Sequence, residues 1–116
     1  MPGNLARTSQ TLKNERPLQR HPRILFSIPI TLQYLGSGGV RSGHGISLDI
    51  SEGGMGALVD RVLQVGDMVG LDLELPERQL STIAIVRYSS SSRSGFEFVG
   101  LTVEERARLA GIVARA

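Results

Sequence analysis

Hydrophobic and polar residues alternate along the chain from residue 24 onward. In the first stretch the apolar side chains all fall on one parity, at Ile24, Phe26, Ile28, Ile30, Leu32 and Tyr34. Because successive side chains of a β-strand point to opposite faces, this alternation predicts one long, half-buried strand. Proline has no N–H for a strand ladder, so Pro29 predicts an edge position or a bulge in that strand.

A second alternating stretch follows residues 36–43, whose glycines and serines predict a flexible loop. Three apolar and three polar side chains alternate over Ile46, Ser47, Leu48, Asp49, Ile50 and Ser51. This pattern predicts a strand with one apolar face and one polar face. Gly53 and Gly54 then end the alternating pattern. Glycine fits a tight turn and leaves the neighbouring polar side chains accessible.

The rest of the chain predicts four more strands and one helix. The strands are expected at residues 55–59, 69–75, 80–88 and 96–98, with a mobile serine-rich loop at 89–95. Thr102 and Glu105 form a capping-box signature, and residues 103–114 carry apolar side chains at helical spacing. Six strands and a terminal helix predict a mainly β fold, an antiparallel barrel or curled sheet with the helix at an opening.

Charge and composition divide the chain into an arm and a body. Residues 1–23 carry five basic residues and one acidic residue, whereas residues 24–116 carry eight arginines and ten acidic residues. We expect a disordered leader over residues 1–14 and a single domain over 15–116. The chain has no apolar run near 20 residues and no signal-like amino end, so we expect a cytoplasmic protein without a membrane span.

The residue types that carry catalysis or bind metals are sparse. The two histidines, His21 and His44, have no histidine or carboxylate at ligand spacing, and the chain has no cysteine. Ser51 lies near Asp49 but lacks a histidine in a motif relation to them. We therefore expect no enzyme activity, no catalytic or metal-binding residues and no cofactor.

Binding suits the polar face of the second strand better. If the apolar neighbours fill a barrel, Asp49 and Ser51 face outward as acceptor and donor beside the glycines. A carboxylate there can accept two hydrogen bonds from the N1 and N2 edge of guanine, or hold an arginine. The alternative is that both side chains only tie down their own turn through backbone hydrogen bonds.

These features together resemble the PilZ domain family. The resemblance runs from about Arg16 to the end and rests on Asp49-x-Ser51-x-x-Gly54, the arginine-rich lead, and Gly95-Phe96-Glu97-Phe98 before a short helix. It implies a bacterial protein with a six-stranded antiparallel β-barrel and a terminal helix. It also implies binding of the second messenger cyclic di-GMP, through an arginine motif in the arm and the aspartate-serine-glycine motif on the barrel.

The arginine motif of the arm can be aligned in two ways. In the family the second arginine usually comes directly before the first strand, which makes it Arg23, but Gln19 then stands where the first is expected. A literal Arg-x-x-x-Arg also exists, from Arg16 to Arg20. Either Arg16 and Arg20 serve, or Arg20 and Arg23 act with Gln19 as a weakened set. Glutamine brings no charge to a phosphate, so the second account predicts looser binding. Arg20 belongs to either register, and we predict the largest loss of binding there.

Two other functions remain open at this point. A degenerate domain that binds the nucleotide weakly or not at all would act as a protein interaction module. A nucleic-acid binder is disfavoured, because the five aromatic residues fall mostly at positions assigned to strand interiors. We expect no DNA binding, a monomer or weak dimer, and a downstream effector protein such as motility or exopolysaccharide machinery. Arg87 and Arg93 either reach a ligand or, more simply, are solvated.

Overall fold

The computed structural model describes residues 22–115, which form seven strands and one helix. The strands are β1 (Ile24–Leu25), β2 (Pro29–Gly36), β3 (Gly39–Ile50), β4 (Gly54–Val59), β5 (Met68–Glu74), β6 (Gln79–Ser89) and β7 (Ser94–Phe98), and the helix is α1 (Val103–Ala114). The predicted disordered leader and two of the predicted site residues, Arg16 and Arg20, lie outside the described residues.

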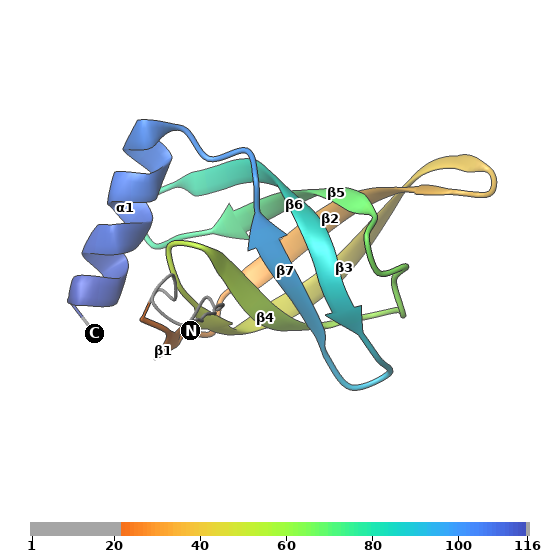
Figure 1. The fold of residues 1–116 in the computed structure, drawn as a ribbon, viewed down its shortest axis with the longest axis horizontal. Helices are drawn as coiled ribbons and strands as arrows, with labels where there is room; N and C mark the ends of the chain where they lie inside the picture. Colours follow the sequence, from red (N-terminus) through yellow and green to blue (C-terminus); the bar gives the residue numbers. More distant parts are fainter. Residues whose placement is uncertain (1–21, 116) are drawn as a thin grey trace, which may run out of the picture.

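Six of the strands close into an antiparallel barrel. The order is β3-β2-β5-β6-β7-β4, the pairing of β4 with β3 closes the ring, and β1 adds two residues beside the end of β3. The helix lies across one end of the barrel, and the β2–β3 hairpin projects past the other end (Figure 1). The predicted fold of six barrel strands and one terminal helix is confirmed.

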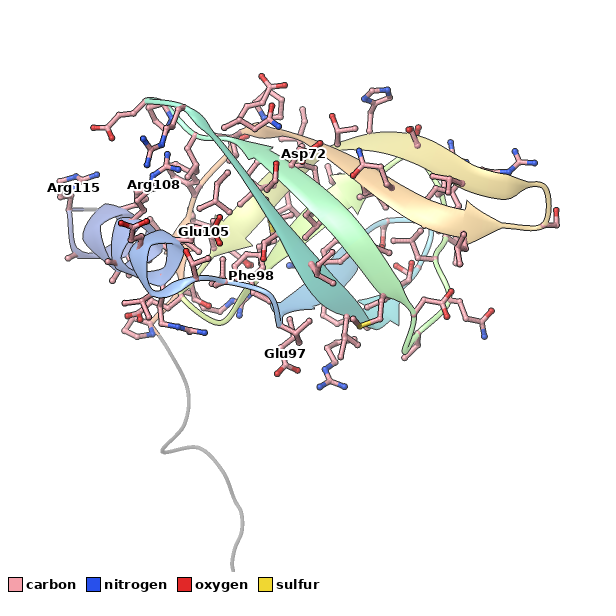
Figure 2. The ribbon with its side chains drawn as sticks, turned by 90° about the horizontal axis from the view of Figure 1, so that it is seen from above. Asp72, Glu97, Phe98, Glu105, Arg108 and Arg115 are labelled. Atoms are coloured by element: carbon pink, nitrogen blue, oxygen red, sulfur yellow. The ribbon has the colours of Figure 1, made fainter. Side chains whose placement is uncertain are left out.

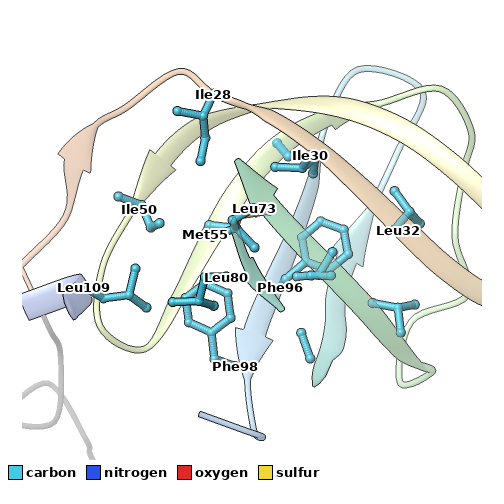
Figure 3. Close-up of a cluster of buried hydrophobic side chains, with 14 of the residues drawn as sticks. Ile28, Ile30, Leu32, Ile50, Met55, Leu73, Leu80, Phe96, Phe98 and Leu109 are labelled. Carbon is cyan, nitrogen blue, oxygen red and sulfur yellow. The ribbon is translucent and has the colours of Figure 1, made fainter. Parts of the chain in front are cut away.

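The barrel interior is filled by aliphatic and aromatic side chains from every barrel strand. Figure 3 shows this core, which includes Ile30, Leu32, Ile50, Met55, Leu73, Leu80, Phe96 and Phe98. The helix contributes Leu109, which is fully buried. Thr102 caps the helix as predicted, because its Oγ1 accepts the Glu105 N–H at 3.1 Å and Glu105 Oε1 accepts the Thr102 N–H at 2.9 Å.

The first predicted strand is interrupted, and the prediction of one continuous strand is wrong. Pro29 begins β2, and residues 26–28 separate it from β1. A buried hydroxyl bridges the interruption, because Ser47 Oγ accepts the Ile28 N–H at 3.0 Å and donates to the Phe26 carbonyl. The predicted parity holds across the break, because Ile28 is buried like Ile30 and Leu32 of β2.

Replacing Ser47 with alanine is expected to lower the free energy of unfolding by about 1–3 kcal/mol, because it leaves two buried backbone groups without their partner. The matched control is Ser42→Ala, which removes an exposed hydroxyl from the same strand. Urea denaturation of both variants measures the effect. Equal stabilities for the two variants would show that the hydroxyl does not hold the break together.

Both predicted loops are shorter than expected. The strands β2 and β3 stay paired as far as Gly36 and Gly39, so residues 36–43 form most of a hairpin rather than a flexible loop. The connection is only Ser37-Gly38, followed by Gly39 at a φ of +114° that favours glycine. In the serine-rich segment, Ser90 Oγ accepts the Arg93 N–H at 3.2 Å and closes a tight turn.

A β-bulge reverses the faces of β3. The register shifts between Ser47 and Asp49, so Ser47 and Ile50 both point into the barrel although they differ in parity. Ile46 is consequently 49% exposed. The expectation that Ile46 shares the apolar face with Ile50 is wrong, because the bulge lies between them.

Within residues 22–115, α1 is too short and too polar to cross a membrane.

Candidate functional site

A polar cleft lies over the outer surface of β7 and its neighbours β4 and β6, at the end of β3. Its volume is about 620 Å³, and it is lined by Arg23, Asp49, Gly53, Gly54, Met55, Arg87, Tyr88, Arg93, Gly95, Phe96 and Glu97. The cleft is flanked by two β-bulges, one in β3 at Ser47/Asp49 and one in β6 at Val86/Tyr88. Bulges redirect side chains, and here they turn polar groups from two separated strands toward one surface.

Asp49 is the centre of this cleft. Its Oδ1 accepts hydrogen bonds from Arg23 Nη2 at 2.7 Å and from the Gly56 N–H at 2.9 Å. Its Oδ2 lies 3.5 Å from Arg93 Nη2. Gly56 permits this approach, because a Cβ there would stand 3.2 Å from Asp49 Oδ1 and 3.1 Å from Arg93 Nη2. One carboxylate therefore holds two guanidinium groups at the mouth of the cleft.

These contacts set the ionisation of Asp49. Partial burial disfavours the charged form and by itself would raise the pKa of the carboxyl. The hydrogen bond from Arg23, the backbone hydrogen bond from Gly56 and the charges of Arg23 and Arg93 act in the opposite direction. Together they hold the pKa of Asp49 below its ordinary value of 3.8. The carboxylate is thus fully ionised at neutral pH.

The lowered pKa predicts how Asp49 contributes to stability as the pH falls. At a pH between the folded pKa and the ordinary value of 3.8, Asp49 is mostly protonated in the unfolded chain and mostly ionised in the folded protein. The contribution is therefore complete above that value and is lost as the pH falls through the folded pKa. We expect the difference in unfolding free energy between wild type and Asp49→Asn to shrink from about pH 5 to about pH 3 in urea denaturation. A difference that stays constant would contradict this.

The other two residues of the motif shape the turn that follows Asp49. Ser51 is 2% exposed, and its Oγ accepts the N–H groups of Gly53 and Gly54 at 3.1 and 3.2 Å. Gly54 is required by a close crossing, because a Cβ there would stand 2.2 Å from the Phe96 carbonyl oxygen. The expectation that Ser51 faces outward is wrong, since its hydroxyl is engaged by its own turn.

The cleft is also lined by Arg87, Tyr88 and Arg93. From the sequence we expected the two arginines to be solvated and most aromatic residues to lie inside the barrel. The β6 bulge explains Tyr88, which is 44% exposed beside the exposed Arg87. Arg87 Nε donates to Glu97 Oε1 at 2.6 Å. Glu97 points away from the barrel, whereas its neighbour Phe98 points inward (Figure 2). No local sequence signal revealed the bulge, because it depends on pairing with β7.

A second groove, of about 450 Å³, separates α1 from residues 24–26 and 75–77. It is more apolar than the cleft at Asp49, and its basic residues are Arg108, in the middle of α1, and Arg115, the C-cap of the helix, both labelled in Figure 2. Arg108 Nη2 already donates to the Arg78 carbonyl at 2.9 Å. The cleft at Asp49 is lined by three arginines and this groove by two, so the cleft offers more guanidinium donors and is the better candidate for an anionic ligand.

Among the predicted site residues, the structure brings together Arg23, Asp49, Ser51 and Gly54. Arg23 lies directly before β1 and reaches across to Asp49, whose neighbour in the ladder is Leu25. The remaining predicted residues, Arg16 and Arg20, fall outside the described part of the chain. The position of Arg23 agrees with the register in which it is the second arginine of the arm motif, although the role of each residue stays a prediction.

Comparisons with known proteins agree with this architecture. The sequence matches the family model of the PilZ domain over residues 17–115. A comparison with curated proteins found no match. Among solved structures, the PilZ domain of CeSA from a cellulose-synthesizing bacterium superposes with a TM-score of 0.64 at 19% identity. That alignment covers 81% of this chain and 96% of the other.

Two further solved structures have similar scores. The inhibitor of motility MotI/DgrA from Bacillus subtilis gives a TM-score of 0.68 at 22% identity, over 89% of this chain and 51% of that protein. The PilZ domain of YcgR from Escherichia coli, solved with c-di-GMP, gives 0.65 at 20% identity, over 84% and 89% of the two chains. At these identities the similarity establishes the fold.

Proposed function

Because this chain belongs to the PilZ domain family, a family of cyclic di-GMP receptor domains, we propose that it is itself a cyclic di-GMP receptor. The ligand is held between the arginines of the arm and the barrel motif of Asp49, Ser51 and Gly54. The observation that carries this proposal is the cleft in which Asp49 holds Arg23 and Arg93.

The charges of the cleft suit a ligand that has phosphates and purine bases. Cyclic di-GMP presents two phosphates, and a guanidinium group can donate two parallel hydrogen bonds to one of them. Arg23 and Arg93 side chains are about half exposed, so both can reach a ligand while Asp49 keeps them oriented. A cleft of about 620 Å³ is also within the range of small-molecule sites.

The three motif residues have different tasks in this proposal. Asp49 orients the two guanidinium groups and offers its Oδ2 to a guanine N–H; within residues 22–115 this oxygen has only the 3.5 Å contact with Arg93. Ser51 and Gly54 act indirectly, because they fix the turn and the strand crossing that place Asp49. Binding that draws Arg16 and Arg20 onto the cleft would change the surface seen by an effector protein, such as motility or exopolysaccharide machinery.

Isothermal titration of the whole chain with cyclic di-GMP tests the proposal. Saturable heat that weakens at higher salt is expected, since arginine–phosphate contacts at the surface are screened. The absence of heat up to high micromolar ligand would refute the receptor and leave the second candidate, a PilZ domain that acts as a protein interaction module. Gln19 is the observation that favours this second candidate, because it replaces a charged group in one register of the arm.

A further inference from the structure

Tyr88 is an aromatic side chain that the motif-based site does not use. It lines the same cleft as Arg23, Asp49 and Arg93, and 44% of it is exposed. By the alternation of β6 it would point into the barrel with Val86, which is fully buried. The bulge at Val86/Tyr88 turns it outward instead. The bulge therefore places an aromatic ring on the surface of the cleft, where alternation alone would have buried it.

The opposite strand fixes the position of the Tyr88 ring. Tyr88 is the ladder partner of Gly95 on β7. A Cβ on Gly95 would lie 2.1 Å from ring atom Cε2 and 2.5 Å from Cζ, so the ring rests directly on the bare backbone of the glycine. Only glycine leaves this space, and the contact holds the ring without covering its outer side. The result is a rigid and partly open aromatic surface.

Two arginines line the cleft together with Tyr88. Arg93, two residues before Gly95 along the chain, lies 3.5 Å from Asp49, and Arg87, directly before Tyr88, pairs with Glu97. A nucleotide needs a flat apolar surface for its base and cationic donors for its phosphate, close to one another. The cleft supplies both within one set of lining residues.

We propose that Tyr88 is the stacking platform for one guanine base of cyclic di-GMP, an inference that rests on the proposed function. Stacking on an aromatic side chain uses the π face of the base, whereas the carboxylate of Asp49 reads its hydrogen-bonding edge. Tyr88 thus adds affinity to the site, and the arginines and Asp49 set the register of the ligand. The hydroxyl of Tyr88 is not required for this role.

Binding measurements on three substitutions separate stacking from packing. Tyr88→Ala is expected to raise the Kd for cyclic di-GMP by roughly 5- to 150-fold, the range measured for loss of one aromatic–base stack. Tyr88→Phe keeps the ring and should stay within about twofold of wild type. Tyr88→Leu covers Gly95 without a π face and should bind as weakly as Tyr88→Ala. Wild-type affinity in Tyr88→Leu would overturn the proposal, because apolar packing alone would then suffice.

Fluorescence gives a direct readout of the stack, because the chain has two tyrosines and no tryptophan. In Tyr34→Phe the only emitter is Tyr88, and a guanine stacked on it should quench the signal with the Kd found by calorimetry. In Tyr88→Phe the only emitter is Tyr34, so that protein reports absorption by the ligand alone and should show no saturable change.

The two readouts together distinguish the proposals. Heat of binding without quenching in Tyr34→Phe would overturn the stacking role of Tyr88 and leave the receptor function intact. Neither heat nor quenching would overturn both. A saturable change that persists in Tyr88→Phe would place the base near Tyr34 and would also overturn the role of Tyr88.

Discussion

Replacing Arg20 with alanine is expected to raise the Kd for cyclic di-GMP by about 10- to 100-fold, the largest loss among the arm arginines. A hydrogen bond to a charged group is worth about 1.5–3 kcal/mol, and each 1.4 kcal/mol changes Kd tenfold. Arg20 serves in either alignment of the arm motif, whereas Arg16 serves only if the pair is Arg16 and Arg20. Titration of Arg16→Ala, Arg20→Ala and Arg23→Ala therefore measures the register as well as the activity.

Arg23→Ala is also expected to weaken binding, because it removes a donor and exposes the carboxylate of Asp49 to the ligand phosphates. Arg23→Lys keeps the charge without the planar fork and should recover only part of the loss. Arg41→Ala is the matched control, since it removes an exposed arginine from the projecting hairpin. Normal binding by Arg20→Ala would contradict the prediction, and a loss in Arg41→Ala would point to net charge instead.

Replacing Gly54 with alanine is expected to lower the free energy of unfolding by about 3 kcal/mol or more. The added Cβ would stand 2.2 Å from the Phe96 carbonyl oxygen, and it would press on backbone atoms that cannot rotate away. Strands β4 and β7 would have to separate where Gly54 pairs with Glu97. Urea denaturation without ligand measures this effect and isolates it from any role of Gly54 in binding.

Gly111→Ala provides the control with the opposite sign. Gly111 lies inside α1, where among the described residues a Cβ would meet the end of the flexible Arg115 side chain at 3.2 Å and nothing closer. Alanine is preferred over glycine in a helix interior by about 0.5–1 kcal/mol, so this variant should be more stable than wild type. If Gly54→Ala unfolds at the same urea concentration as wild type, the strand crossing is not as tight as the structure indicates.

The same contact explains why a motif residue can matter without touching a ligand. Gly54 and Ser51 are buried and are occupied by the turn and the strand crossing. Their substitution would disturb Asp49 through the backbone, because the Gly56 N–H that binds Asp49 lies two residues beyond Gly54. Loss of binding in such variants therefore has to be compared with their stability before a contact role is assigned.

The sequence was a good guide to where most strands and the helix lie along the chain. Apolar and β-branched runs located β4 and β6, and alternation located β5 and β7, each within a few residues. The pair Thr102 and Glu105 located the start of α1. These features depend on local side-chain periodicity and on hydrogen bonds between residues three apart in the chain. The sequence was less successful at glycine- and serine-rich segments, because the flanking strands stay paired into these segments and leave only short turns.

By itself the sequence determined the class of fold, the chain positions of most strands, the helix and the motif that marks the barrel side of the site. The tertiary structure alone decided which side chains meet there. Two bulges change the face of Asp49 and Tyr88 relative to the strands that carry them, and both arise from the register in which each strand pairs with the next strand of the barrel. A period-two pattern cannot reveal such a shift, because one extra residue on one side of a ladder inverts every later position.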